Sequence, residues 1–61
     1  MTAADLTKLW NRNHRPGAQV IYAGIVQTTT KSTAFVNETG EAVIKLDGFG
    51  VVPLIDLRVT E

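Results

Sequence analysis

No cysteine occurs in this chain of 61 residues, and this absence constrains its fold more than any other feature of the sequence. A domain of this size buries only about 60% of the surface that its unfolded chain exposes, so it usually needs a disulfide, a metal or a second copy to be stable. Disulfides and thiolate metal sites are excluded, and one histidine, His14, cannot complete a zinc site. We therefore expect no metal, no cofactor, and either one well-packed core or a homo-oligomer.

Residues 1–14 are predicted to form an amphipathic helix at the start of a single domain that spans 1–61. Thr2 is a suitable N-cap, and Asp5 three residues later completes a capping box in a weakened form. Three apolar residues lie on one face of this helix: Leu6, Leu9 and Trp10. A helix this short is unstable alone, so we expect this face to dock on the rest of the chain, with Trp10 in the core rather than as an anchor for a partner.

Residues 18–61 change in character to β-branched and aromatic residues interrupted by turn residues, which favours short strands. The expected strands are Gln19–Val26, Thr30–Val36, Glu41–Leu46, Val51–Leu54 and Arg58–Thr60, with a single helical turn at Ile55–Leu57. Gly24 inside the first strand indicates a bulge or bend. Short strands with tight turns at Asn37–Gly40 and Asp47–Gly50 favour a small antiparallel barrel of about five strands, because closing the sheet removes exposed edges.

Alternation along the third expected strand assigns its residues to two faces. Ala42, Ile44 and Leu46 share one face, which we expect to point into the core. Four apolar residues are expected on outer faces, where they would form a surplus for binding: Ile21, Ile25, Val43 and Ile55.

The stretch Asp47–Val59 resembles the end of an SH3-like barrel of the Tudor and KOW kind, in which a strand leads into a one-turn helix carrying a Leu and then into a terminal strand. The whole chain also resembles small uncharacterised proteins encoded by phages and prophages. The segments that carry this second resemblance are Leu9–Arg12, Pro16–Tyr22 and Thr28–Ala34. The two resemblances imply an SH3-like barrel and a phage or prophage origin, and they imply no activity.

Catalysis is not predicted. General acid–base catalysis needs titratable groups that are brought together, whereas the carboxylates fall at a helix cap, in turns or at the terminus, which are solvated positions: Asp5, Glu38, Glu41, Asp47, Asp56 and Glu61. The hydroxyl-rich run Thr28–Thr33 could hold a phosphate with the help of Lys31, but it lacks the glycines of a P-loop. The alternative interpretation is a polar edge strand.

A small set of basic and aromatic residues is predicted to form a binding surface: Lys8, Arg12, Arg15, Tyr22, Lys31 and Phe49. Lys8 and Arg12 are four residues apart and share a helix face. Phe49 lies between two glycines, so it serves either as a recognition tip or as a cap on the barrel end. The aromatic residues are too dispersed in the sequence for a cage around a cation.

We therefore expect a non-enzymatic binding or adaptor module whose partner is a protein or a second copy of itself. The alternative is a nucleic-acid-binding barrel that uses the six basic residues: Lys8, Arg12, Arg15, Lys31, Lys45 and Arg58. Six acidic residues balance these six, so the chain as a whole carries no strong field for nucleic acid. No apolar run reaches the roughly 20 residues of a membrane span, and the N-terminus lacks the pattern of a signal peptide, so we expect a cytoplasmic protein with no membrane partner.

Overall fold

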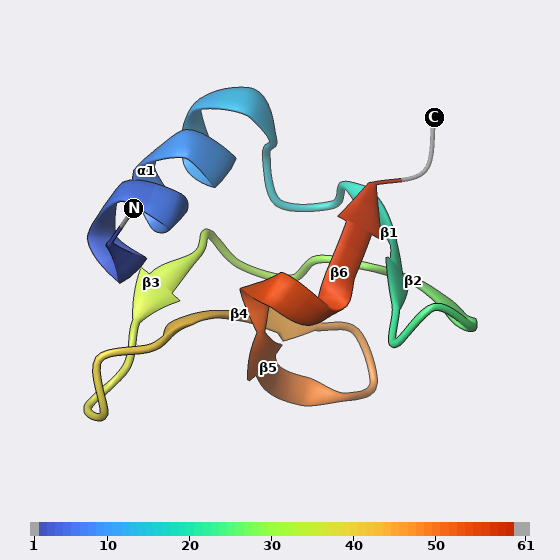
Figure 1. Cartoon of the computed structure of the whole chain (residues 1–61). Coiled ribbons are helices and arrows are strands. Elements are labelled where there is room, and N and C mark those ends of the chain that lie inside the picture. Colours follow the sequence, from blue (N-terminus) through green and yellow to red (C-terminus); the bar gives the residue numbers. More distant parts are fainter. Residues whose placement is uncertain (1, 60–61) are drawn as a thin grey trace.

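The computed structural model describes residues 2–59 and is mainly β with an N-terminal helix, as predicted (Figure 1). The elements in chain order are α1 (Ala3–Asn13), β1 (Gln19–Tyr22), β2 (Val26–Thr29), β3 (Phe35–Val36), β4 (Ala42–Leu46), β5 (Gly50–Pro53), the 3-10 turn η1 (Leu54–Asp56) and β6 (Leu57–Val59). Met1, and the Thr60 that we expected in the last strand, lie outside the described residues.

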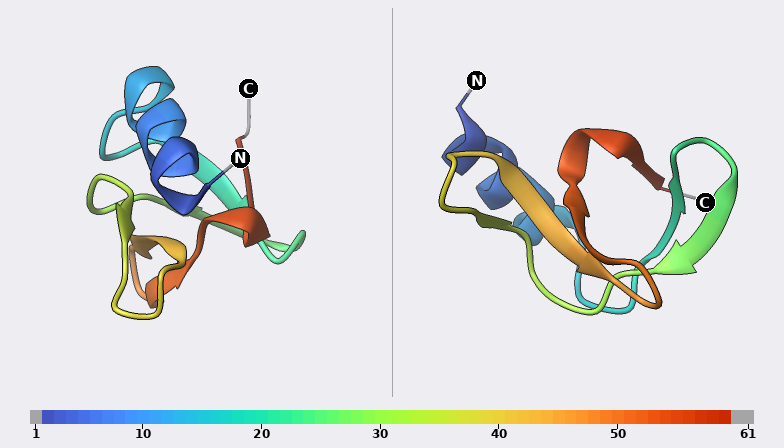
Figure 2. Two further views of the ribbon diagram at one scale, coloured as in Figure 1. Left: turned by 60° about the vertical axis from the view of Figure 1, so that its left-hand side comes forward. Right: turned by 90° about the horizontal axis from the view of Figure 1, so that it is seen from below.

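The strands form two antiparallel three-stranded sheets, with the orders β2-β1-β6 and β3-β4-β5 (Figure 2). The chain that leaves β2 joins the two sheets, because Thr30 forms an isolated bridge with Leu46. On either side of that bridge, the Asp47 N–H donates to the Thr29 carbonyl at 3.0 Å and the Lys31 N–H donates to the Lys45 carbonyl at 2.8 Å. Between residues 2 and 59, backbone pairing thus forms two sheets that meet along one seam.

The first expected strand, Gln19–Val26, is wrong beyond Tyr22. Ala23 has a φ of 54° and Gly24 a φ of 78°, and two consecutive residues with positive φ reverse the chain in a tight hairpin. Tyr22 pairs with Val26 across this turn, so the chain turns back where a bulge was expected. The sequence-based interpretation missed the turn because Ala23, unlike glycine or asparagine, rarely adopts this conformation.

The second expected strand, Thr30–Val36, is also wrong, since only Phe35 and Val36 at its end are in a strand. The hydroxyls at its start bond to other segments. The Thr30 hydroxyl accepts the N–H groups of Gly17 and Ala18 at 3.1 and 3.2 Å, and Thr30 is 2% exposed. The residues after Thr30 and before β3 therefore form a loop, which begins at the contact of Thr30 with the segment after the helix.

The C-terminal elements are close to expectation but shifted by one residue. The helical turn begins at Leu54 and not at Ile55, because Leu57 already pairs with Tyr22 in β6. Pro53 ends β5, which pairs only with β4, and this edge position agrees with the missing N–H of proline.

The core lies between the two sheets and the helix, around three fully buried side chains: Val20, Ile44 and Leu46. Ala42, Ile44 and Leu46 share the core face of β4, as predicted. The exposure expected for Val43 is wrong, because this residue is 3% exposed although it lies on the other face of β4. Phe35 and Pro53 are its cross-strand neighbours, and together they account for its burial.

The helix α1 docks on the core through Leu6 and Trp10 of the predicted face, but not through Leu9. The capping box between Thr2 and Asp5 is confirmed. Thr7 is the buried residue of the helix, whereas Leu9, expected in the core, is 43% exposed. Next to this face, the Asn11 carboxamide accepts the Ala34 N–H at 2.8 Å and donates to the Ala34 carbonyl at 3.0 Å, which holds α1 against the chain before β3.

Candidate binding groove

A groove of about 250 Å³ is lined by residues of α1 and of the η1–β6 segment. Its lining is mostly apolar and consists of Leu6, Leu9, Trp10, Asn13 and His14 on the helix side and Leu54, Ile55 and Leu57 on the other. Leu54 and Leu57 are buried and belong to the core cluster, on which Leu6 and Trp10 pack. The base of the groove is therefore continuous with the core.

One wall of the groove is formed by Trp10 and His14, which lie one helical turn apart. Their ring centroids are 4.2 Å apart with an interplanar angle of 32°, and the His14 N–H caps the helix by donating to the Trp10 carbonyl. Trp10 is half-buried, so it both packs on the core as predicted and contributes a surface to the groove. The Nδ1 atom of His14 is buried without a hydrogen-bond partner, which costs free energy wherever water cannot reach it.

The rim of the groove exposes aliphatic side chains. Ile55 is 81% exposed, because Leu54 and Leu57 on either side of it occupy the core and direct the middle of the turn outward. Leu9 lies on the opposite rim. A large exposed aliphatic group beside an apolar hollow is typical of a surface that binds another molecule.

Several charged residues are neighbours of the lining residues in the chain. Arg12 and Arg15 flank the lining residues Asn13 and His14 in the chain, and Arg58 follows Leu57. All three arginines are exposed, and no described carboxylate forms an ion pair with them. Two acidic residues also adjoin the lining in the chain, Asp5 before Leu6 and Asp56 between Ile55 and Leu57.

Two of the predicted site residues, Tyr22 and Phe49, are brought together. Their ring centroids are 5.8 Å apart at an interplanar angle of 50°, so the turn between β4 and β5 rests on the end of β1. Tyr22 packs against the core cluster, whereas Phe49 is exposed on its outer side. This pair contributes side-chain contact between the two sheets.

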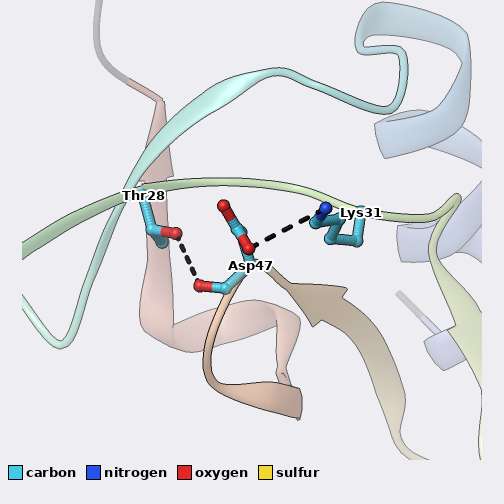
Figure 3. A network of polar contacts seen from close by, with 3 residues as sticks. All are labelled: Thr28, Lys31 and Asp47. Carbon is cyan, nitrogen blue, oxygen red and sulfur yellow. Dashed lines mark hydrogen bonds and ion pairs between the residues drawn. The ribbon is translucent and has the colours of Figure 1, made fainter.

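Lys31 lies in a polar contact with the same turn (Figure 3). Its Nζ is 3.8 Å from Asp47 Oδ1, and the Thr28 hydroxyl donates to the Asp47 carbonyl at 3.0 Å. Both charged side chains are exposed, so the pair contributes little stability. A carboxylate beside Lys31 and hydroxyls engaged with backbone leave little for a phosphate. The alternative of a polar edge strand holds for Thr28 and Thr29, which end the edge strand β2, but not for the residues after Thr30.

The remaining predicted site residues, Lys8, Arg12 and Arg15, are exposed on and just after α1. The helix lies at the opposite end of the molecule from the turn between β4 and β5 in both figures (Figures 1 and 2). The predicted binding surface is therefore divided into a basic helical part and an aromatic part, and only the first adjoins the groove.

Sequence reasoning missed the groove residues Asn13, His14 and Ile55 as a group. A usable signal existed for the helix side, because Trp10 and His14 are four residues apart and therefore share a face. No signal placed Ile55 opposite them, since that contact depends on how η1 follows β5.

A second hollow of about 350 Å³ lies on the β1–β2 hairpin and is lined by Gln19, Val20, Gln27, Thr28 and Thr29. Its lining is more polar, and the Thr28 hydroxyl is already bonded to Asp47. It offers fewer apolar contacts than the groove beside α1.

Two searches of residues 2–59 gave no further site. No cluster of three or more histidine, cysteine or acidic residues there could hold a metal ion. No helix in this part of the chain has the length and apolar character needed to cross a membrane. Comparison of the chain with protein-family models, with curated proteins and with solved structures finds no match.

Proposed function

We propose that this protein is a small non-enzymatic binding module that holds a segment of a partner protein in the groove between α1 and η1–β6. The observation that carries this proposal is Ile55, an aliphatic side chain that is 81% exposed on the rim of an apolar groove whose base is the core. An exposed group of this kind gains most when a partner covers it, because each buried methylene contributes about 0.8 kcal/mol.

The carboxylates of the described residues support a role without catalysis. Asp5 belongs to the capping box, Glu41 accepts a hydrogen bond from Thr39, and Asp47 pairs with Lys31. These three carboxylates form local structural contacts at exposed positions, and none of the three lines the groove.

The SH3-like barrel that the resemblance implies is part of the same proposal. The strand order supports it: β6-β1-β2 continues through the Thr30–Leu46 bridge into β4-β5, and a 3-10 turn precedes the last strand. The contact between Tyr22 and Phe49 supplies closure by side chains. Nuclear Overhauser contacts between Tyr22 and Phe49 in solution are expected, and their absence would contradict the closed arrangement.

The phage or prophage origin remains part of the proposal on the resemblance alone. The genomic neighbourhood of the coding sequence tests it, since adjacent phage structural or regulatory genes are expected.

The binding function is tested by selecting short peptides from a random displayed library on the immobilised protein, and by titrating the selected peptides against two variants. Ile55→Glu is expected to weaken binding by about tenfold or more, because a charge replaces the central apolar contact. Ile25→Glu is the matched control: Ile25 is 84% exposed but does not line the groove, so binding should be unchanged. Equal binding by both variants would contradict the proposal.

A further inference from the structure

The sheet β3-β4-β5 has an outer face that the core does not use. Ala42, Ile44 and Leu46 occupy the inner face of β4 and belong to the core cluster, on which the helix packs. Alternate residues of a strand point to opposite faces, so Val43 and Lys45 point outward. Val43 is nevertheless buried, although it is not part of the core cluster. The outer face therefore has a buried residue of its own.

The strand register shows which side chains share this outer face. Residues directly opposite each other in antiparallel strands point to the same face. Val43 lies opposite Phe35 on β3 and opposite Pro53 on β5, and Lys45 lies opposite Val51. Phe35 is 42% exposed and Val51 is 54% exposed. Around Val43, the outer face thus exposes apolar side chains from both flanking strands.

Glu41 continues this face just before β4 begins. The Asn37 N–H donates to the Glu41 carbonyl at 2.9 Å, which extends the pairing of β3 and β4 by one pair. The Thr39 hydroxyl lies 2.9 Å from Asn37 Oδ1 and 3.0 Å from Glu41 Oε1, so these side chains lie on one side of the turn. Alternation gives the order Glu41, Val43, Lys45 along the outer face. An acid and a base therefore lie at equal spacing on either side of an apolar centre.

These two charges complement a second copy of the chain in one orientation. Glu41 and Lys45 are both exposed, and neither forms an ion pair with another residue between 2 and 59. If two copies meet face to face with their β4 strands antiparallel about a two-fold axis at Val43, residue 41 of each copy faces residue 45 of the other. Two pairs of opposite charge then form. Parallel β4 strands would instead set Glu41 against Glu41 and Lys45 against Lys45.

The apolar residues fit the same two-fold axis. Phe35, Val43 and Pro53 form one row across β3, β4 and β5, so an axis along this row brings each of them against its own copy. Sheets that pack face to face lie about 10 Å apart, a distance that a lysine and a glutamate side chain can span together. An apolar centre with charged groups at its rim is the usual arrangement of an interface. A face of so few side chains is smaller than the standard of about 800 Å² per partner, so the dimer is expected to be weak.

We propose that the outer face of β3-β4-β5 is the interface of a two-fold symmetric dimer, in which Val43 lies at the axis and Glu41 of each copy pairs with Lys45 of the other. This inference goes beyond the proposed function, because none of these residues lines the groove. A domain of this size buries little of its own surface, so a second copy on this face adds to the apolar surface that it can cover.

Sedimentation equilibrium of the full chain over a concentration series provides the first test. The native chain is expected to dimerise reversibly below about 1 mM, and a chain that stays monomeric at that concentration would overturn the proposal. Glu41→Lys and Lys45→Glu each set two pairs of like charges against each other, so each should weaken dimerisation by about tenfold. Lys8→Glu is the matched control: it makes the same change of charge at an exposed position of α1 and should leave the dimer unchanged. Circular dichroism checks that each variant is folded.

Restoring the charge pairs provides the second test. The double variant Glu41→Lys/Lys45→Glu exchanges the signs of both pairs and should dimerise as the native chain does. A mixture of the two single variants should form a heterodimer, detected as shifts in the amide signals of one isotope-labelled variant when the other is added. A mixture of Glu41→Lys with Lys8→Glu has the same net charges and should not associate. If neither combination restores the dimer, the antiparallel pairing is overturned.

Other interfaces and occupants give different results. A dimer that Ile55→Glu dissociates and the charge variants do not affect would lie at the groove, and this inference would be wrong. If the selected peptides shift the amide signals of Phe35 and Val43 and the chain stays monomeric, the occupant of this face is a partner protein and the second copy is overturned. A monomer that binds peptides in the groove would leave only the proposed function. A dimer with the expected charge dependence that selects no peptide would leave only this inference.

Discussion

The two sides of helix α1 differ in how many of their side chains are buried or hydrogen-bonded to the rest of the chain. On the side of β3, Asn11 forms two hydrogen bonds with the backbone of Ala34, and Thr7 is buried. On the side of η1, Leu9 and Ile55 are exposed and both line an open groove, and His14 Nδ1 is buried without a hydrogen-bond partner. One helix thus has a closed side and an open side.

This difference separates stability from binding within a single short helix. Groups that bond to buried backbone are expensive to remove, because the partner is left unsatisfied. Groups on an open rim contribute little to folding, since they stay in water, but they remain available to another molecule. Substitutions on the closed side should therefore lower mainly the stability of the fold, whereas substitutions on the open rim should weaken mainly peptide binding.

The largest effect is expected on the closed side. Asn11→Ala leaves the N–H and C=O of Ala34 without partners in a residue that is 5% exposed, so the free energy of unfolding should fall by about 2 kcal/mol. Asn13→Ala is the matched control on the same helix, and it should change stability by less than about 0.5 kcal/mol. Urea unfolding followed by circular dichroism measures both. Similar losses for the two variants would remove the distinction between the sides.

On the open side, we expect a smaller change in the free energy of unfolding, and of the opposite sign. His14→Phe keeps a ring against Trp10 and removes the unpartnered nitrogen, so the free energy of unfolding should rise by about 1 kcal/mol. His14→Ala removes the ring as well and should lower it. A loss for His14→Phe in the same urea experiment would mean that Nδ1 is satisfied in solution and that this wall is closed.

A smaller rise in the free energy of unfolding is expected for a substitution in the β1–β2 hairpin, whose Ala23 N–H donates to the Asp56 carbonyl of η1. Ala23→Gly relieves a left-handed conformation that costs about 1–2 kcal/mol, but glycine adds freedom to the unfolded chain that costs about 0.5–1 kcal/mol. The net gain should be about 0.5 kcal/mol by thermal unfolding. Ala4→Gly, at an exposed position in α1, should instead lose about 1 kcal/mol. The same sign for both variants would show that Ala23 is not strained.

The smallest effect on stability is expected for Ile55→Ser. Its side chain is mostly in water already, so the free energy of unfolding should change by less than about 0.5 kcal/mol. Binding of the selected peptides should nevertheless weaken by about tenfold. A large loss of stability would place Ile55 in the core and would abolish the contrast between the two sides of α1.

The helix shows how far the sequence could be interpreted. Its start and end were predicted, because the capping box of Thr2 and Asp5 and the break at Pro16 are local signals. The face that docks was predicted in part: Leu6 and Trp10 pack on the core, whereas Leu9 stays exposed. The burial of Thr7 and the bonds of Asn11 to Ala34 were not predicted. A hydrogen bond to a residue 23 positions away leaves no trace in the periodicity.

The strands show the same limit. The turn Asn37–Gly40 and the core face of β4 follow from local residue types and alternation, and the structure confirms both. The hairpin at Ala23 and the loop after Thr30 were missed, because an alanine accepted an unusual φ and a threonine bonded to the segment after the helix. Tertiary contacts overrode local preference at both places.

The sequence by itself determined a small cysteine-free chain with one capped helix, short antiparallel strands and their main turns, because caps, alternation and turn residues act within a few positions. Only the tertiary structure decided which side of α1 stays open and that Ile55 and Leu57 lie beside it. The reason is physical: these positions result from contacts between segments far apart in the chain, whose energies depend on geometry that no local pattern specifies.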